Sequence, residues 1–299
     1  ADADFVLGVG AEVGLYTSEG GLLFPQASVA RIDIKSAPDE IGATPGLFVH
    51  GDAARTVAAL NEILERQRIQ KEGFRTSSTR KVLEARPVFS EKPTDGLDPR
   101  SLAGHLSKAL PKGALVTCGM GHFFSFLAMY LTLPQDGEMH FSYQFDAIGQ
   151  TLPLSTGIGI GSPGRPHIAI EGDGSLMMYL QELDTLVRYR VPLVLIVWND
   201  GGYGAEVHKL RAKGLEPRLA QWKSPNFVSL ARSFGGDGVR LKAEHEIVDA
   251  VNHGLGQGGL FLIDAPVSPT TISDPFRKLF FGQANQAPLL RRQTKHQQA

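Results

Sequence analysis

Cysteine is nearly absent from this sequence of 299 residues, in which Cys118 stands alone. A single cysteine excludes an intramolecular disulfide framework and is typical of proteins from a reducing compartment, so we expect a cytoplasmic location. Nothing beside Cys118 suggests activation of its thiol. We interpret this side chain as a small buried apolar group.

An excess of charge of either sign is also missing, because 30 Lys and Arg face 31 Asp and Glu. The strong basic surface that nucleic acids or anionic membranes attract is therefore not expected. No apolar run approaches the roughly 18 residues that cross a bilayer, and the N-terminus lacks the basic and apolar regions of a signal peptide. The sequence favours a globular enzyme without nucleic-acid or membrane partners.

Hydrophobic residues make up 42% of the chain, and the 34 glycines exceed the usual share, which indicates many tight turns or ligand-facing backbone. The chain opens with "ADADFVLGVG", a polar turn that runs directly into a buried strand, and it has no initiator methionine. We expect a fragment or a processed subunit.

Short apolar runs alternate with helical patterns over residues 5–64, which predicts a parallel sheet flanked by helices. The alternation stops over residues 66–98 and resumes from Ser101. We therefore predict an α/β protein with doubly wound parallel sheets in two Rossmann-like three-layer domains. The expected segments are a first domain at 1–65, a linker at 66–99, a second domain at 100–285 and a polar tail at 286–299.

The run "HIAIEG" is apolar enough for a strand buried on both faces, and Asp173 follows it between two glycines. Ligands of open parallel sheets gather at the carboxyl ends of the strands. Ser175 is the expected N-cap of a helix over 175–190, whose free N–H groups would favour a phosphate. An aspartate beside a phosphate requires a cation between them, and magnesium is the usual one. Asp173 is therefore a predicted metal ligand.

A second polar cluster, Asn199-Asp200-Gly201-Gly202, follows the strand "PLVLIVW". A right-handed crossover makes the two strands parallel, so Asp200 should reach the same edge and the same ion. The glycines permit a tight turn that directs a backbone carbonyl at the metal. Gly-Asp-Gly alone is a common structural turn; its pairing with the second cluster favours a cation site.

The Gly-Asp-Gly, an intervening helix and strand, and Asn-Asp before Gly-x-Tyr-Gly together resemble the thiamine diphosphate signature of acetolactate synthase, benzoylformate decarboxylase and their relatives. The resemblance covers nearly the whole chain. It implies that residues 1–65 are the later part of the family's central domain and that residues 100–285 are its diphosphate-binding domain.

By this resemblance, magnesium is held by the side chains of Asp173 and Asp200 and by the carbonyl of Gly202. The family more often has Asn at position 200. "CGMGHFF" lies where acetolactate synthases carry a diphosphate loop, so His122 would contact phosphate and Phe123 would contribute backbone. A locally satisfied histidine at a helix start is the alternative for His122.

"FDAIGQTLP" resembles the loop that holds the aminopyrimidine, in which Ile148 would wedge the cofactor into its bent conformation and the Asp146 carbonyl would accept from the 4′-amino group. A β-turn before an ordinary helix is the alternative here. The full set of cofactor-binding residues that the resemblance implies is His122, Phe123, Asp146, Ala147, Ile148, Asp173, Gly174, Ser175, Asp200, Gly202, Tyr203 and Gly204.

The family's activating glutamate comes from a pyrimidine-binding domain, generally on a neighbouring subunit, and no such domain is visible in this sequence. No catalytic residue is therefore named, and we expect the rest of a longer chain or a partner subunit to supply it in a homo-oligomer, a dimer or a tetramer. Glu206 and His208 border the expected substrate entrance and are expected to be solvated. Some acetolactate synthases carry FAD, but "VLGVGAEVG" departs from a dinucleotide fingerprint, and we interpret it as a structural turn.

The function that the resemblance implies is decarboxylation of a 2-oxo acid followed by carboligation to a carbonyl acceptor, with thiamine diphosphate and magnesium. A simple 2-oxo acid decarboxylase and a non-catalytic cofactor-binding subunit are the alternatives. The sequence does not identify the 2-oxo acid or the acceptor.

Overall fold

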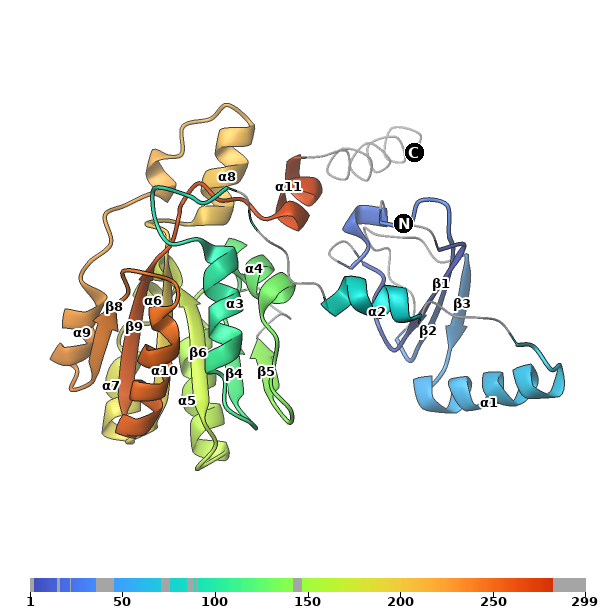
Figure 1. Ribbon diagram of the computed structural model, residues 1–299, viewed down its shortest axis with the longest axis horizontal. Helices are drawn as coiled ribbons and strands as arrows, with labels where there is room; N and C mark the ends of the chain where they lie inside the picture. Colours follow the sequence, from blue (N-terminus) through green and yellow to red (C-terminus); the bar gives the residue numbers. More distant parts are fainter. Residues whose placement is uncertain are drawn as a thin grey trace, which may run out of the picture. The chain divides into compact units, whose positions relative to one another are not determined.

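The computed structural model describes residues 3–14, 17–21, 23–35, 46–70, 76–84, 89, 91–141 and 147–281. The chain forms two compact units (Figure 1). One unit comes from Ala1–Ser90 and Asp274–Ala299, and the other is Glu91–Ser273. In the described part of the chain, no helix has both the length and the apolar character that a bilayer span requires.

The first unit contains a parallel sheet in the order β1 (Phe5–Val9), β2 (Ser28–Asp33), β3 (Leu47–His50). Its helical elements are η1 (Glu19–Gly21), α1 (Ala53–Arg66), α2 (Ser77–Glu84) and α11 (Asp274–Phe281). A side chain at Gly8 would meet Val13 Cγ2 at 2.8 Å, so this glycine serves local packing, consistent with a structural turn. Helix α2 occupies part of the segment for which the sequence predicted only a linker.

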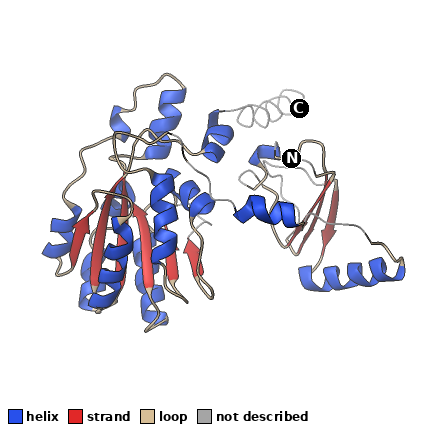
Figure 2. Ribbon diagram, in the orientation of Figure 1, coloured by secondary structure: helices blue, strands red, loops and turns tan. Residues whose placement is uncertain are grey.

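The second unit is a doubly wound α/β domain with six parallel strands (Figure 2). Along the sheet the strands are β5 (Glu138–Phe141), β4 (Leu115–Cys118), β6 (His167–Gly172), β7 (Leu193–Asn199), β9 (Leu260–Pro266) and β8 (Asp237–Arg240). The helices are α3 (Pro99–Ala109), α4 (His122–Tyr130), α5 (Thr151–Gly161), α6 (Asp173–Met178), α7 (Glu182–Arg188), α8 (Gly204–Ala212), α9 (Phe227–Ser233) and α10 (Glu246–Gln257), with a 3₁₀ turn η2 at Arg218–Ala220.

Alternate residues of the central strands enter two separate hydrophobic cores. In β7, Ile196 belongs to the core beneath α3, α4 and α10, whereas Leu195 belongs to the core beneath α5, α6, α7 and α9. Burial on both faces explains why β6 and β7 are continuous apolar runs in the sequence rather than alternating ones. The prediction of a doubly wound parallel sheet is confirmed.

The strand order reverses direction between β4 and β6. From β4 the chain crosses to β5 on one side, and it then returns to β6 on the other side of β4. The two connections diverge above this gap, which leaves a crevice at the carboxyl ends of the strands. Asp173 begins the helix that leaves this gap from β6.

The helix predicted over 175–190 is in fact two helices, α6 and α7, separated at Tyr179–Gln181. The leucine periodicity runs through this break, so the residue pattern predicts one continuous helix. Gly149, with φ of 93°, packs so closely on the Tyr179 ring that any side chain at Gly149 would overlap it. Contact with a distant loop therefore accompanies the break. The edge strand β5 and helix α11 were also not predicted.

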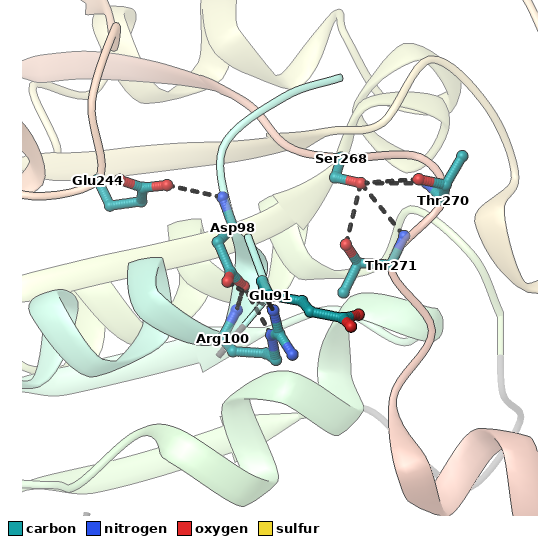
Figure 3. A network of polar contacts seen from close by, with 7 residues as sticks. All are labelled: Glu91, Asp98, Arg100, Glu244, Ser268, Thr270 and Thr271. Carbon is teal, nitrogen blue, oxygen red and sulfur yellow. Dashed lines mark hydrogen bonds and ion pairs between the residues drawn. The ribbon is translucent and has the colours of Figure 1, made fainter. Parts of the chain in front are cut away.

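Helix α3 begins in a polar network that joins three segments of the second unit (Figure 3). The carboxylate of Asp98 is buried, and it accepts from the backbone N–H of Arg100 at 2.9 Å and from the Arg100 guanidinium at 2.8 Å. The backbone N–H of Asp98 donates to Glu244 Oε1 at 2.8 Å, and Arg100 Nη2 donates to the Glu91 carbonyl at 2.7 Å. Asp98 thus acts as a helix cap and as a charge partner at once.

We predict that Asp98→Ala lowers the free energy of unfolding of the second unit by about 2 kcal/mol. The substitution removes the helix cap and the hydrogen bonds that the Arg100 guanidinium donates to Asp98. The measurement is urea unfolding followed by circular dichroism. Asn226→Ala is the matched control, since Asn226 caps α9 through one bond to the Ser229 N–H and has no charge partner there. If Asp98→Ala costs no more than this control, the network adds nothing to the cap.

Candidate cofactor site

The two polar clusters meet at the carboxyl edge of the sheet. Strands β6 and β7 pair in parallel with Gly172 opposite Trp198, so Asp173 and Asp200 leave the sheet side by side. A pocket opens above them. Its lining includes every predicted cofactor-binding residue except Asp146 and Ala147, namely His122, Phe123, Ile148, Asp173, Gly174, Ser175, Asp200, Gly202, Tyr203 and Gly204. Asp146 lies outside the described residues, and Ala147 is half-buried beside Ile148.

The carboxyl groups of Asp173 and Asp200 face each other in a poorly solvated place. Burial, followed by the neighbouring Asp173 charge, raises the pKa of Asp200 to about 8. Burial also raises the pKa of Asp173. Two carboxylates that share one site cannot both ionise easily, unless a cation lies between them. This environment fits a divalent cation.

The two oxygens of Asp173 differ in their surroundings. Oδ2 accepts from Trp222 Nε1 at 3.1 Å and from Ser224 Oγ at 2.9 Å. Oδ1 is buried and has no hydrogen-bond partner among the residues that the structure describes. A buried carboxylate oxygen without a donor is costly, and coordination of a metal would satisfy it.

The third predicted ligand, the carbonyl of Gly202, belongs to a turn that only glycines permit. Gly201 has φ of 72°, and a side chain at Gly202 would meet the Ala220 carbonyl oxygen at 2.5 Å. The described residues contain no cluster of three or more His, Cys, Asp or Glu side chains that could hold a metal. A cation at this edge would thus depend on two carboxylates, backbone oxygen and the oxygens of its own ligand, which suits magnesium.

Helix α6 starts at Asp173 with Gly172 as its N-cap, so the prediction that Ser175 is the N-cap is wrong. Ser175 lies instead in the first helical turn and is buried. The N–H groups of Gly174 and Ser175 belong to the part of a helix that has no intrahelical acceptor. The phosphate that the sequence predicts at this helix start stays a prediction.

The rings of Tyr203 and Trp222 pack closely against Gly174 in the first turn of α6. A side chain at Gly174 would meet Tyr203 Cε1 at 2.6 Å and the Trp222 ring at 2.8 Å, and the two rings contact each other edge to face at 4.8 Å. A side chain at Gly204 would overlap the Asp200 carboxyl group. Gly174 therefore leaves space for the Tyr203 and Trp222 rings, and Gly204 leaves space for the Asp200 carboxyl group.

His122 lines the pocket, but its ring is directed into the protein. Its Nε2 accepts from the Ser273 N–H at 3.2 Å, and its ring packs edge to face on His208 at 4.6 Å. Burial, followed by the nearby His208, lowers the pKa of His122 to about 3, so the imidazole is neutral. His208 is itself buried, which corrects the expectation that it is solvated. Glu206 is exposed, as expected.

Phe123 is buried and lines the pocket. Its ring lies 3.3 Å from where a side chain on Gly172 would begin, and it stacks on Trp198 with ring centroids 6.4 Å apart. Ile148 also lines the pocket, and 36% of its surface is accessible, so a ligand could contact it.

Glu171 is a further charged residue at this edge that the sequence reasoning passed over. Its side chain is fully buried, and burial raises its pKa to about 7. A side chain on Gly119 would overlap its carboxyl group, which places it at the gap between β4 and β6. A glutamate within an otherwise apolar strand was the available signal. No comparable sequence signal pointed to Trp222 and Ser224, because they lie 49 and 51 residues beyond Asp173.

Comparison with known proteins agrees with this geometry. Residues 119–265 match the family model described as thiamine pyrophosphate enzyme, C-terminal TPP binding domain. The chain is 24% identical to acetolactate synthase of Bacillus subtilis over 267 residues, which are 89% of this chain and 47% of that protein. It is 22% identical to sulfoacetaldehyde acetyltransferase of Castellaniella defragrans, with coverage of 85% and 47%. The chain thus spans about half the length of the curated relatives it matches.

Among solved structures, the chain is similar to the thiamine diphosphate-dependent 4-hydroxybenzoylformate decarboxylase of Rhodococcus jostii RHA1. The TM-score is 0.68 at 22% identity, and the match covers 89% of this chain and 49% of the other. This likeness supports the fold. The family match identifies residues 119–265 as a C-terminal TPP binding domain of thiamine pyrophosphate enzymes, and the chain is similar in sequence to acetolactate synthases.

Proposed function

We propose that this chain binds thiamine diphosphate and magnesium, and that it forms part of an enzyme that decarboxylates a 2-oxo acid and joins the remaining carbon unit to a carbonyl acceptor. The observation that carries the proposal is the facing pair Asp173 and Asp200 beside the gap between β4 and β6. Two facing carboxyl groups, one of which has a buried oxygen with no hydrogen-bond partner among the described residues, support a site for a divalent cation. A diphosphate is the ligand that such a cation and the free N–H groups of α6 would hold.

Different residues of the pocket would hold different parts of the cofactor. Asp173, Asp200 and the Gly202 carbonyl would bind magnesium, and the backbone N–H groups of Gly174 and Ser175 would donate to the diphosphate. The buried imidazole of His122 fixes the start of α4 through Ser273, so the backbone at His122 and Phe123 is the part available to phosphate. Ile148 would support the bend of the cofactor, and the Asp146 carbonyl keeps its proposed role toward the aminopyrimidine. Ala147 and Tyr203 complete the cofactor's surroundings, with Gly204 leaving room for Asp200.

When bound, thiamine diphosphate supplies the nucleophilic carbon and the electron sink for decarboxylation. The chain contributes orientation and exclusion of water, which are large parts of catalysis by cofactor enzymes. The activating glutamate is proposed to come from a pyrimidine-binding domain, in the same longer chain or in a partner subunit, within a homo-oligomer. FAD is not assigned.

A simple decarboxylase is the second candidate, favoured by the structural similarity to a 4-hydroxybenzoylformate decarboxylase. The two functions share every residue discussed above and differ only in the fate of the product carbon. A non-catalytic cofactor-binding subunit is the third. Their discrimination requires product analysis.

We predict that Asp173→Ala abolishes magnesium-dependent binding of thiamine diphosphate to the full chain, because one of two charged ligands is lost. The measurement is isothermal titration calorimetry with and without magnesium. Asp249→Asn, which removes an exposed carboxylate from α10, is the control and should bind as the unmodified chain does. An unchanged affinity in Asp173→Ala would refute the site.

We predict that Asp200→Asn stabilises the metal-free chain at alkaline pH. Since the pKa of Asp200 is raised from 3.8 to about 8, its stabilising contribution is complete below 3.8 and is lost as the pH rises through about 8. The Asp200→Asn variant has no ionisable group at this position, so its stability does not fall in this way as the pH rises. Its melting temperature in chelator should therefore exceed that of the unmodified chain at about pH 9, with a smaller difference at about pH 5. A pH-independent difference would contradict the facing carboxyl pair.

The reaction itself is tested on the complete assembly, including the pyrimidine-binding domain. Incubation with pyruvate and other 2-oxo acids, followed by mass spectrometry, should yield a hydroxyketone with a newly formed carbon–carbon bond. An aldehyde alone would support the decarboxylase, and the absence of both products would support the non-catalytic subunit.

A further inference from the structure

The segment that follows α8 returns to the turn at Gly201 and Gly202, and it brings two hydrogen-bond donors to Asp173. The Tyr203 N–H donates to the Ala220 carbonyl at 2.9 Å, and the Trp222 N–H donates to the Gly201 carbonyl at 3.0 Å. These bonds form a short antiparallel bridge between Gly202 and Gln221. The bridge fixes the backbone of Trp222 against the turn, so the indole position follows from the same geometry that shapes the turn.

Both donors reach the same oxygen of Asp173. Trp222 Nε1 lies 3.1 Å and Ser224 Oγ 2.9 Å from Oδ2, whereas the buried Oδ1 has no partner in the described parts of the chain. The indole is held in place by its edge-to-face contact with Tyr203. A carboxylate restrained through one oxygen cannot rotate freely about its Cβ–Cγ bond. The other oxygen, Oδ1, is thereby the one left without a donor.

Ser224 lies between Asp173 and a second acceptor, Asn199. Its Oγ lies 2.8 Å from Asn199 Oδ1, and Asn199 Nδ2 donates to Asp264 Oδ1 at 2.9 Å. Asp264 is buried and forms an ion pair with Arg240, so it acts as an acceptor and sets the orientation of the Asn199 amide. Ser224 has one hydroxyl hydrogen for two acceptors. The charged carboxylate of Asp173 takes it, since hydrogen bonds to ionised groups are the stronger ones.

We propose that Trp222 and Ser224 are positioning residues that hold Asp173 as a one-oxygen ligand and thereby select magnesium over calcium. This inference rests on the proposed function. Magnesium requires a near-ideal octahedron with short bonds, which suits single-oxygen ligation; calcium accepts carboxylates through one oxygen or both and tolerates irregular geometry. Removal of the restraint frees Oδ2, which allows Asp173 to offer both oxygens to the larger ion.

The test compares magnesium and calcium on the full chain at a saturating concentration of thiamine diphosphate. Each metal is titrated separately by calorimetry into the unmodified chain, Trp222→Phe and Ser224→Ala. Trp222→Phe keeps an aromatic ring against Tyr203 and removes the N–H donor. Each variant should bind magnesium about 10-fold more weakly, as is common when a group supporting a metal ligand is lost. Calcium affinity should change less, so that the ratio of magnesium to calcium affinity falls.

Two controls separate positioning from general loss of structure. Ser224→Thr keeps the hydroxyl group and should restore the preference for magnesium. Ser233→Ala removes a hydroxyl that donates to the Ser229 carbonyl in α9, and it should leave both affinities unchanged. The melting temperature of each metal-free variant is recorded alongside.

A magnesium-to-calcium ratio that stays at its original value in both Trp222→Phe and Ser224→Ala would overturn the proposal, whether or not the melting temperature falls. If the unmodified chain binds thiamine diphosphate with no need of metal, the proposed function fails and this inference fails with it. Metal-dependent binding with an unaltered ratio would overturn the inference alone.

Discussion

The structure depends on one unfavourable contact: two carboxyl groups, delivered by neighbouring parallel strands, face each other where water has little access. Such a pair raises the free energy of the folded chain unless a proton or a cation neutralises it. The surrounding sequence maintains the contact rather than relieving it. Glycines at 174 and 204 leave the space, and Trp222 and Ser224 restrain the carboxylate of Asp173. Retention of so costly an arrangement is typical of a functional site.

The fold explains why the site lies at this position. A doubly wound sheet has one gap from which the chain departs in opposite directions, and Asp173 stands at the exit from that gap. The second unit alone brings together the residues proposed to bind metal and diphosphate. The chemistry on the substrate is proposed to need a pyrimidine-binding domain as well, so the described pocket would supply one part of the proposed catalytic centre.

Much of this could be predicted from the sequence, because the information was local or followed from topology. Continuous apolar runs identified β6 and β7, and parallel strands linked by a crossover must present Asp173 and Asp200 at one edge. Contacts between segments far apart in the chain were not accessible in this way. The restraint by Ser224, the burial of His208 and the helix break at Tyr179 all depend on tertiary packing.

The most direct test of the central claim is an anomalous-scattering map from crystals of the full chain grown with manganese, as a substitute for magnesium, and thiamine diphosphate. The account predicts a single strong peak within coordination distance of Asp173 Oδ1 and an Asp200 oxygen, with the diphosphate beside it. A peak elsewhere in the second unit, or diphosphate density with no metal between these two carboxylates, would contradict it.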